Sequence, residues 1–361
     1  MAEMDLCSMY LTELEALFAA WSEPKFRAKQ VFSWLSRGAR PCEMTNLPRA
    51  LRERLETLTF GSAVLYDKRI SQKDGTAKHL FELEDKNLVE GVLMRYRYGN
   101  TLCISTQVGC KMGCAFCAST LEGCVRNLTA GEMLGFLSAV ERDEGRGEGH
   151  GRAVTNVVLM GSGEPLDNYD NVVRFLRLVS DKDGKNISPR NISLSTCGLV
   201  PEIYRFIEEA PHVTLSVSLH APNDALRDKL MPINRRYPVA ALLEAANAYA
   251  LKTGRRVVFE YALIGGLNDG RIHADELSDR VRGINCHVNL IPLNPVPERG
   301  LEGVTRERAE AFAAWLSRRG VSATVRREMG TDIEGACGQL RRRVLKEITA
   351  EAETQGKGAG Q

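Results

Sequence analysis

The chain of 361 residues contains 43% hydrophobic and 26% charged residues, which is typical of a folded globular protein and excludes a disordered, collagen-like or coiled-coil chain. Its 48 basic and 46 acidic residues give a net charge of only +2, so the total charge indicates no partner by itself. Every apolar run is shorter than the ~20 residues that a membrane-spanning helix needs, and the N-terminus lacks a signal-peptide pattern. We therefore expect a cytoplasmic protein whose ten cysteines serve metal, redox or catalytic chemistry.

The N-terminal residues 1–60 carry apolar side chains at helical spacing and predict a small helical domain. Between Pro24 and Arg54, eight lysines and arginines face only two glutamates, a local charge of +6. This charge favours RNA phosphates as partners, although such a run is also typical of a solvated helix face. Residues 61–100 change to short alternating runs around a polar turn at 84–87, which predicts a β-hairpin that links this domain to the rest of the chain.

Residues 101–350 alternate β-branched apolar runs with amphipathic stretches. Strands separated by helices predict an α/β fold with a parallel sheet, here a partial or full (βα) barrel whose chemistry lies at the C-terminal strand ends. The expected strands are 102–105, 156–160, 192–195, 213–218, 257–263, 287–292 and 323–326. We expect a flexible loop at the glycine-rich residues 145–151 and a disordered tail at 351–361.

Three cysteines, Cys110, Cys114 and Cys117, follow the first predicted barrel strand with spacings of three and two residues. A short loop of this kind can place three thiolates around an iron–sulfur cluster. A structural zinc site normally takes two separated ligand pairs, and no second pair lies downstream at a suitable spacing, so zinc is the weaker interpretation. Cys103 or Cys124 could supply a fourth ligand. Alternatively, a [4Fe–4S] cluster with three cysteine ligands keeps one iron open to bind a reactant.

A second motif, Gly161-Ser-Gly-Glu-Pro165, follows the next predicted strand. Its glycines allow close backbone approach, and the carboxylate of Glu164 can receive an ammonium group. Read alone, the motif could equally be a tight strand-to-helix turn. One βα unit after the three-cysteine loop, it resembles the S-adenosylmethionine (SAM) binding element of the radical SAM superfamily. This resemblance implies that the open iron binds SAM and that one electron cleaves SAM to a 5′-deoxyadenosyl radical.

Further motifs narrow the resemblance from a superfamily to a family. Six motifs occur in the order found in the RlmN/Cfr family of radical SAM RNA methyltransferases, at residues 107–117, 160–165, 195–198, 218–224, 291–294 and 336–340. Residues 26–34 and 44–48 resemble the RlmN branch. The resemblance implies one [4Fe–4S] cluster and SAM as cofactors, 23S rRNA and tRNA as substrates, and an external one-electron donor such as flavodoxin or ferredoxin. We expect a monomer that does not associate with a membrane.

The family's SAM contacts carry over to matching positions of this chain. They are Gly163, Glu164, Ser195, Ser218, Leu219, His220 and Asn294. Read alone, His220 would be a hydrogen-bonded structural histidine. Its position at the end of a predicted strand favours the binding site.

The resemblance also implies three catalytic residues, Cys337, Cys103 and Glu90. Adenine C2 is electron-poor and cannot attack SAM as a nucleophile, so the methyl group must arrive by another route. The family's route is that Cys337 accepts a methyl from one SAM, a radical from a second SAM removes a hydrogen from it, and the methylene adds to C2. Cys103 then attacks Cys337, releasing the product and forming a disulfide. Read alone, Cys103 would be interpreted as a small, buried hydrophobic residue. Glu90 is the implied proton acceptor, but read alone it would be interpreted as an exposed carboxylate on a strand.

The implied activity is methylation of C2 of adenosine 2503 in 23S rRNA and of adenosine 37 in tRNA. Methylation of C8 of the same rRNA adenosine, the Cfr activity, stays open as an alternative. A non-catalytic RNA-binding protein with a structural metal is the alternative from another class. Cys337 favours an enzyme, because a structural metal site has no use for a thiol so far along the chain from the cysteine loop.

Overall fold

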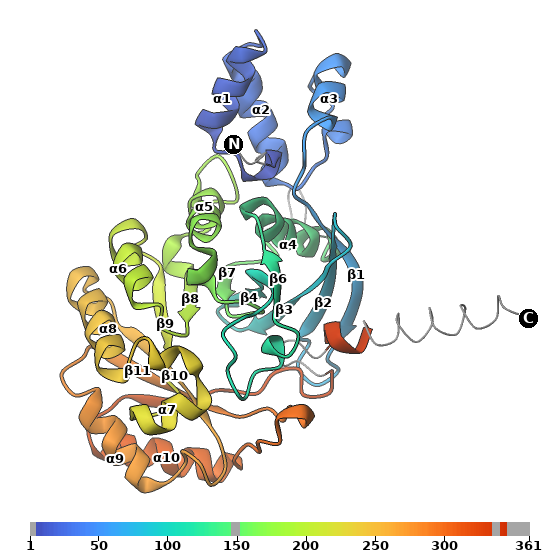
Figure 1. Ribbon diagram of the computed structural model, residues 1–361. Coiled ribbons are helices and arrows are strands. Elements are labelled where there is room, and N and C mark those ends of the chain that lie inside the picture. Colours follow the sequence, from blue (N-terminus) through green and yellow to red (C-terminus); the bar gives the residue numbers. More distant parts are fainter. Residues whose placement is uncertain (1–4, 146–151, 334–339, 345–361) are drawn as a thin grey trace, which may run out of the picture.

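The computed structural model of the protein describes residues 5–145, 152–333 and 340–344. The predicted tail at 351–361, most of the glycine-rich loop (146–151) and Cys337 lie outside these residues. Along the described chain, a helical part is followed by antiparallel strands and then by a parallel sheet with helices along one side (Figure 1). Within the described ranges, no helix is both long and apolar enough to span a bilayer.

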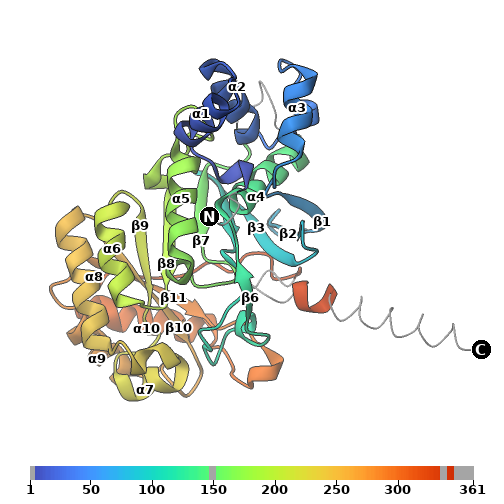
Figure 2. The same ribbon diagram turned by 45° about the horizontal axis from the view of Figure 1, so that its top comes forward.

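The N-terminal part contains the helices α1 (Leu11–Ala20), α2 (Lys25–Ser36) and α3 (Arg49–Glu56), as the apolar spacing predicted. Their buried side chains join the main hydrophobic core, and include Leu14, Phe18, Val31, Phe32, Leu51 and Leu55. The basic side chains lie on the outside, and Lys25, Lys29, Arg37, Arg40, Arg49 and Arg54 are exposed. These helices stand together at one end of the molecule, next to α4 and α5 (Figures 1 and 2).

Three antiparallel strands follow, β1 (Ala63–Ile70), β2 (Ala77–Leu83) and β3 (Leu88–Tyr96). The β2–β3 hairpin and its turn match the prediction, but β1 was not predicted as a third strand. A bulge between Leu65 and Asp67 interrupts its pairing and its alternation. Strand β3 also pairs with β4 (Gly99–Ile104), so the hairpin extends the main sheet instead of forming a separate linker.

All the predicted barrel strands occur. After β4 they are β7 (Asn156–Leu159), β8 (Ile192–Thr196), β9 (Thr214–Ser218), β10 (Val257–Leu263), β11 (Cys286–Pro292) and β12 (Ala323–Val325), each parallel to its neighbours in this order. The 10-stranded sheet runs from β1 to β12, and these two edges do not pair within the described residues. The fold is therefore α/β with an open, partial barrel, which confirms the predicted fold class.

Helices connect the parallel strands and lie along one side of the sheet (Figure 2). They are α4 (Ala130–Asp143), α5 (Tyr169–Ser180), α6 (Val200–Glu209), α7 (Asp224–Leu230), α8 (Val239–Thr253), α9 (Arg271–Arg280) and α10 (Arg306–Arg318). Strand β8 shows how the sheet orients its side chains, because Ile192 and Leu194 are buried while Ser193 and Ser195 are half-buried. This alternation turns polar side chains toward the side opposite the helices.

Candidate active site

The three-cysteine loop lies between two short antiparallel strands, β5 (Gln107–Gly109) and β6 (Cys124–Asn127). Its first ligand candidate, Cys110, donates its backbone N–H to the carbonyl of Gly123 (2.8 Å). Gly109 has φ +81°, and a Cβ there would lie 2.1 Å from the Gly123 carbonyl oxygen, so this entry to the loop requires glycine. The sequence did not predict this pair, because strands of three and four residues are too short to show a period.

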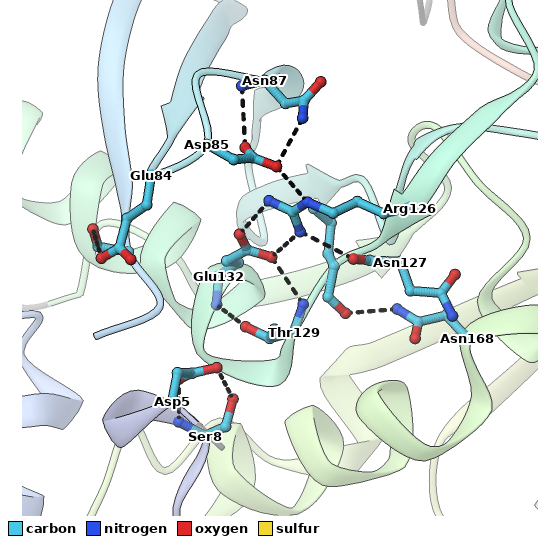
Figure 3. A network of polar contacts seen from close by, with 12 residues as sticks. Asp5, Ser8, Glu84, Asp85, Asn87, Arg126, Asn127, Thr129, Glu132 and Asn168 are labelled. Atoms are coloured by element: carbon cyan, nitrogen blue, oxygen red, sulfur yellow. Dashed lines mark hydrogen bonds and ion pairs between the residues drawn. The ribbon is translucent and has the colours of Figure 1, made fainter. Parts of the chain in front are cut away.

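Side chains from distant parts of the chain fix the returning strand β6, as Figure 3 shows. The Arg126 guanidinium donates to Asp85 in the β2–β3 turn (2.6 Å) and to both carboxylate oxygens of Glu132 in α4 (2.8 and 2.9 Å). The hydrogen bond from Arg126 lowers the pKa of Asp85 to about 2. Glu132 also accepts the N–H of Thr129, whose hydroxyl accepts the N–H of Glu132, and this capping box begins α4.

The loop itself packs against the segments that follow β9 and β11. Ala115 donates its N–H to the carbonyl of Leu230 at the end of α7 (2.8 Å). Cys114 belongs to a buried cluster with Cys197, Leu230 and other apolar residues. Arg299, which follows β11, donates to the hydroxyl of Thr120 (2.7 Å). Contacts within the protein therefore hold the loop at several points.

The thiols of this loop are largely shielded from water. Cys110 and Cys114 are buried, and Cys117 is half-buried. Burial, reinforced by the nearby Cys117, raises the pKa of Cys110 to about 12, and burial raises the pKa of Cys114 still further. Thiolates at these positions need a positive partner, and iron, a metal that takes thiolate ligands, would supply it. The donor set thus fits an iron–sulfur cluster.

Nowhere in the described parts of the chain do three histidine, cysteine, aspartate or glutamate side chains form a group that could hold one ion. A zinc ion requires its ligands to converge on one point, whereas an iron–sulfur cluster takes its cysteines on separate iron atoms. Of the two alternative fourth ligands, Cys103 lies in another apolar cluster, with Val92 and Met94.

The Gly163-Glu164 turn follows β7 and fits closely against β5. Gly163 has φ +108°, and a Cβ there would lie within 2.8 Å of both Gln107 and Thr106. Glu164 is buried, and burial raises its pKa. Its carboxylate accepts the backbone N–H groups of Cys197 (2.7 Å) and Leu166 (3.0 Å). The motif is thus a tight strand-to-helix turn, and it also presents a carboxylate at a strand end.

The next two strands bring Ser195 and Ser218 together, with their hydroxyl oxygens 3.5 Å apart. Leu219 and His220 follow directly and are buried. The Nδ1 atom of His220 accepts the N–H of Ala262 (2.9 Å). The ring therefore makes the structural hydrogen bond expected for this histidine when it is read without the family resemblance. Burial lowers the pKa of His220 to about 3, which keeps the ring neutral. The ring also contacts Phe116 of the cysteine loop edge-on, with centroids 4.8 Å apart.

Asn294 follows β11 and is exposed, and it lines a cavity of about 820 Å³. The cavity extends from Ala118, next to the cysteine loop, to Val92 and Met94 of β3. Its volume is in the range of sites for small molecules and cofactors. The cavity therefore connects the cysteine loop with the strand that carries Glu90.

Glu90 is buried in β3, so its interpretation as an exposed strand carboxylate is wrong. One carboxylate oxygen lies 3.2 Å from the ammonium nitrogen of Lys78, a fully buried residue of β2. The other oxygen accepts the backbone N–H of Arg341 (2.6 Å). The exposure was misjudged because the residues around 341 cover this strand, a contact that strand alternation cannot reveal. Cys103 is buried in β4 opposite Val92.

The described residues on both sides of Cys337 are fixed to the antiparallel strands. Before it, Gly330 donates its N–H to Asp74 (2.9 Å), and Asp332 accepts the hydroxyl of Ser71 (2.6 Å). After it, Arg341 binds Glu90 and donates from Nε to the carbonyl of Leu88 (2.8 Å). The β1–β2 turn and β3 thus hold the two flanks of the segment that carries Cys337.

Comparison with known proteins agrees with this geometry. Residues 104–276 match the model of the radical SAM superfamily, and residues 4–60 match that of the ribosomal RNA large subunit methyltransferase N-terminal domain. The chain is 49% identical to the "Probable dual-specificity RNA methyltransferase RlmN" of Alkaliphilus oremlandii over 96% of this chain and 100% of that protein. A protein of the same name from Thermoanaerobacter pseudethanolicus is 47% identical over 95% of this chain and 99% of that protein. The chain belongs to the RlmN family of radical SAM methyltransferases.

A solved structure supports the same assignment. A radical SAM methyltransferase from Sphaerobacter thermophilus superposes with a TM-score of 0.87 and 45% identity, covering 93% of this chain and 98% of that one. Radical SAM proteins use a [4Fe–4S] cluster and SAM, as the sequence predicted. In this RlmN-family chain, the predicted residues Gly163 and Glu164 lie in the turn that follows β7, and Ser195, Ser218, Leu219 and His220 lie at or directly after the ends of β8 and β9.

Several residues that support the site were not predicted from the sequence. Gln107 accepts the N–H of Glu164 (2.9 Å), and Asn268 donates to the carbonyl groups of His220 and Ala262 (2.9 and 2.6 Å). Lys78 faces Glu90, and a buried Arg227 lies beneath the ends of β8 and β9. Arg227 lies beyond the motif at residues 218–224, and the local sequence gave no signal for either Arg227 or Lys78.

Proposed function

We propose that this protein methylates C2 of adenosine 2503 in 23S rRNA and of adenosine 37 in tRNA. The dual-specificity name of its nearly full-length relatives supports both substrates. The match of residues 4–60 to an N-terminal domain of ribosomal RNA methyltransferases supports the C2 activity over the C8 activity, because the predicted RlmN-branch motifs lie there. Lys25 and Lys29 of α2 and Arg49 and Arg54 of α3 are exposed, which suits contacts to RNA phosphates.

The observation that carries the proposal is the hydrogen bond from the Arg341 N–H to Glu90 (2.6 Å). It joins the residues that follow Cys337 to the proposed proton acceptor in β3. Strand β3 pairs with β4, in which Cys103 lies opposite Val92. This connectivity supports a site in which Cys337, Cys103 and Glu90 act on one substrate base.

We assign the cluster to Cys110, Cys114 and Cys117, and SAM to Gly163, Glu164, Ser195, Ser218, Leu219, His220 and Asn294. When bound, the cluster and SAM supply an electrophilic methyl group and a radical that abstracts hydrogen. His220, being neutral, adds no positive charge that would repel the sulfonium of SAM. The buried carboxylate of Glu164 offers a partner for the ammonium of SAM.

The protein's own residues carry the remaining steps. Cys337, as a thiolate, takes up the methyl group, and after hydrogen abstraction its methylene carbon bonds to C2 of the adenine. Glu90 removes the proton from C2, and the unpaired electron of the adduct passes to the oxidised form of the external one-electron carrier, which leaves a thioether between Cys337 and the base. Cys103, as a thiolate, then attacks the sulfur of Cys337, an S–S bond forms, and the bond between that sulfur and the methylene carbon breaks. The released carbon takes up a proton and becomes the methyl group, and the disulfide is reduced by an external thiol before the next turnover.

Nucleoside analysis tests the proposal directly. Unmodified 23S rRNA and tRNA are incubated anaerobically with the reconstituted enzyme, SAM and a one-electron reductant. The digested nucleosides are separated by liquid chromatography against authentic standards and identified by mass spectrometry. We expect 2-methyladenosine from both RNAs. 8-Methyladenosine would show the C8 alternative to be correct, and unmodified adenosine with intact SAM would favour the non-catalytic alternative.

A further inference from the structure

Arg227 of α7 is fully buried and takes no part in the chemistry proposed above. Its guanidinium donates to the carbonyl groups of Cys197 (2.7 Å) and Ser218 (3.0 Å) through Nη2, and to the carbonyl of Leu219 (3.1 Å) through Nε. Nη1 donates to the side chain of Asn234 (3.1 Å). One side chain therefore binds the backbone just after β8 and at the end of β9.

These carbonyl groups belong to the segments assigned to SAM. Ser218 and Leu219 are themselves assigned contacts, and Cys197 donates its N–H to the carboxylate of Glu164 (2.7 Å). Arg227 thus connects the ends of β8 and β9 and, through Cys197, the turn after β7. Because a planar guanidinium has donors in fixed directions, its hydrogen bonds also fix the relative positions of these strand ends.

The same helix holds the cysteine loop. Leu226 and Leu230 flank Arg227 and belong to the buried cluster that contains Cys114, and the carbonyl of Leu230 accepts the N–H of Ala115 (2.8 Å). The thiols of Cys114 and Cys197 lie within electrostatic reach of the guanidinium. Arg227 is therefore a positive charge beside a proposed cluster ligand.

The charge of Arg227 is not neutralised by a direct carboxylate partner. Across the described ranges, no carboxylate hydrogen-bonds to it, and the nearby Asp224 and Asp228 accept from Asn234 instead (3.0 and 2.7 Å). Burying a guanidinium is unfavourable unless hydrogen bonds and opposite charges offset the loss of hydration. Carbonyl groups and Asn234 accept its hydrogen bonds, and Asp224 and Asp228 act on its charge only from a distance. A cluster bound by three thiolates carries negative charge.

We propose that Arg227 is a positioning residue with two roles: its fork fixes the strand ends that bind SAM, and its charge stabilises the one-electron-reduced cluster. Reduction adds one electron from an external reductant to the cluster and so makes it more negative. A buried positive charge favours this form and raises the reduction potential. The proposal rests on the assigned cluster ligands and SAM contacts but on no RNA step.

Two substitutions separate the roles. Arg227→Lys keeps the positive charge but loses the planar guanidinium with its fixed N–H directions. Arg227→Gln loses the charge. Both are made in the full-length, anaerobically reconstituted protein, with Arg227→Met as a second neutral variant if Arg227→Gln does not load the cluster. The matched control is Arg255→Met, because Arg255 is a half-buried arginine that donates to Thr214 at the opposite end of β9 (2.7 Å).

The reduction potential is measured by titration with dithionite, followed by electron paramagnetic resonance, and SAM affinity by equilibrium binding to the oxidised cluster. We expect the neutral variants to have a lower potential than the wild type and Arg227→Lys to have a similar one. Both kinds of variant should bind SAM about tenfold more weakly, as expected for the loss of one charged hydrogen bond. Arg255→Met should change neither quantity.

An unchanged potential in a cluster-loaded neutral variant would overturn the charge role. Unchanged SAM affinity in Arg227→Lys would overturn the role of the fork, and a shift in Arg255→Met as large as that in Arg227→Gln would attribute both effects to general loosening of the fold. Neither measurement uses RNA, so failure here is distinct from a failure of the proposed methylation, which nucleoside analysis reports.

Discussion

His220 makes the stability of this fold depend on pH in a direction set by burial. The ring is 6% exposed, and burial together with the nearby Arg227 lowers its pKa to about 3. A histidine in an unfolded chain has a pKa of about 6.5. Between these two values the unfolded chain binds a proton that the folded protein does not. The stability contributed by neutral His220 is therefore present above about pH 6.5 and is lost as the pH falls toward 3.

The size of this effect follows from the two pKa values. Between pH 7 and pH 5, protonation of His220 in the unfolded chain should remove about 2 kcal/mol from the free energy of unfolding. The result depends little on the folded pKa, because the folded ring is still neutral at pH 5. His220→Gln should lack this contribution while its side chain can still accept the N–H of Ala262.

Urea unfolding of iron-free protein at both pH values, followed by circular dichroism, measures the difference. The wild type should lose about 2 kcal/mol more than His220→Gln on going from pH 7 to pH 5. His212→Gln, at an exposed position, is the control for removing a histidine and should behave like the wild type. Equal pH dependence of the wild type and His220→Gln would refute the reasoning.

Four further predictions follow from the described contacts. Lys78→Met should lower the free energy of unfolding in urea by about 3 kcal/mol, because it removes the ammonium group that faces the buried carboxylate of Glu90. The double variant Lys78→Met/Glu90→Gln should recover part of this loss. No recovery would contradict a direct pair between the two side chains. Replacing any one of the three loop cysteines by alanine should abolish SAM cleavage and lower the iron content, and stoichiometric zinc in the wild type would contradict the cluster. Gly163→Ala should weaken SAM binding at least tenfold, since its Cβ would collide with Gln107; wild-type affinity by equilibrium binding would count against this close fit. Replacing the exposed Lys25, Lys29, Arg49 and Arg54 together by glutamine should weaken RNA binding and reduce its salt dependence in filter binding while SAM cleavage persists. Unchanged RNA affinity would make the basic segment a solvated surface.

The parallel sheet could be predicted because its strands are apolar, β-branched and separated by amphipathic helices. Whether the barrel closes could not be predicted, because closure depends on pairing between the edge strands β12 and β1. No local sequence pattern indicates that pairing. β5 and β6 were missed for a related reason. They are too short for a period, and the hydrogen bond between Cys110 and Gly123 that defines their loop becomes visible only in three dimensions.

Site residues were predictable where chemistry requires a particular residue type at a particular spacing. The three cysteines and the Gly163-Glu164 turn are of this kind. Residues that act through tertiary contacts were not predictable from the sequence. Lys78 and Arg227 are examples, because nothing in their local sequence indicates that these charged side chains are buried. The misjudged exposure of Glu90 has the same origin, since the residue that covers it, Arg341, lies far along the chain.

Comparison of Cys103→Ala with Cys337→Ala tests the two-cysteine mechanism most directly. Each full-length variant is incubated anaerobically with SAM, reductant and RNA and then analysed by denaturing electrophoresis and mass spectrometry. Cys337→Ala lacks the methyl acceptor and should methylate neither protein nor RNA. Cys103→Ala lacks only the thiolate that resolves the adduct, so it alone should accumulate as protein joined to RNA through Cys337. Retained RNA methylation in Cys337→Ala, or full activity in both variants, would contradict the mechanism.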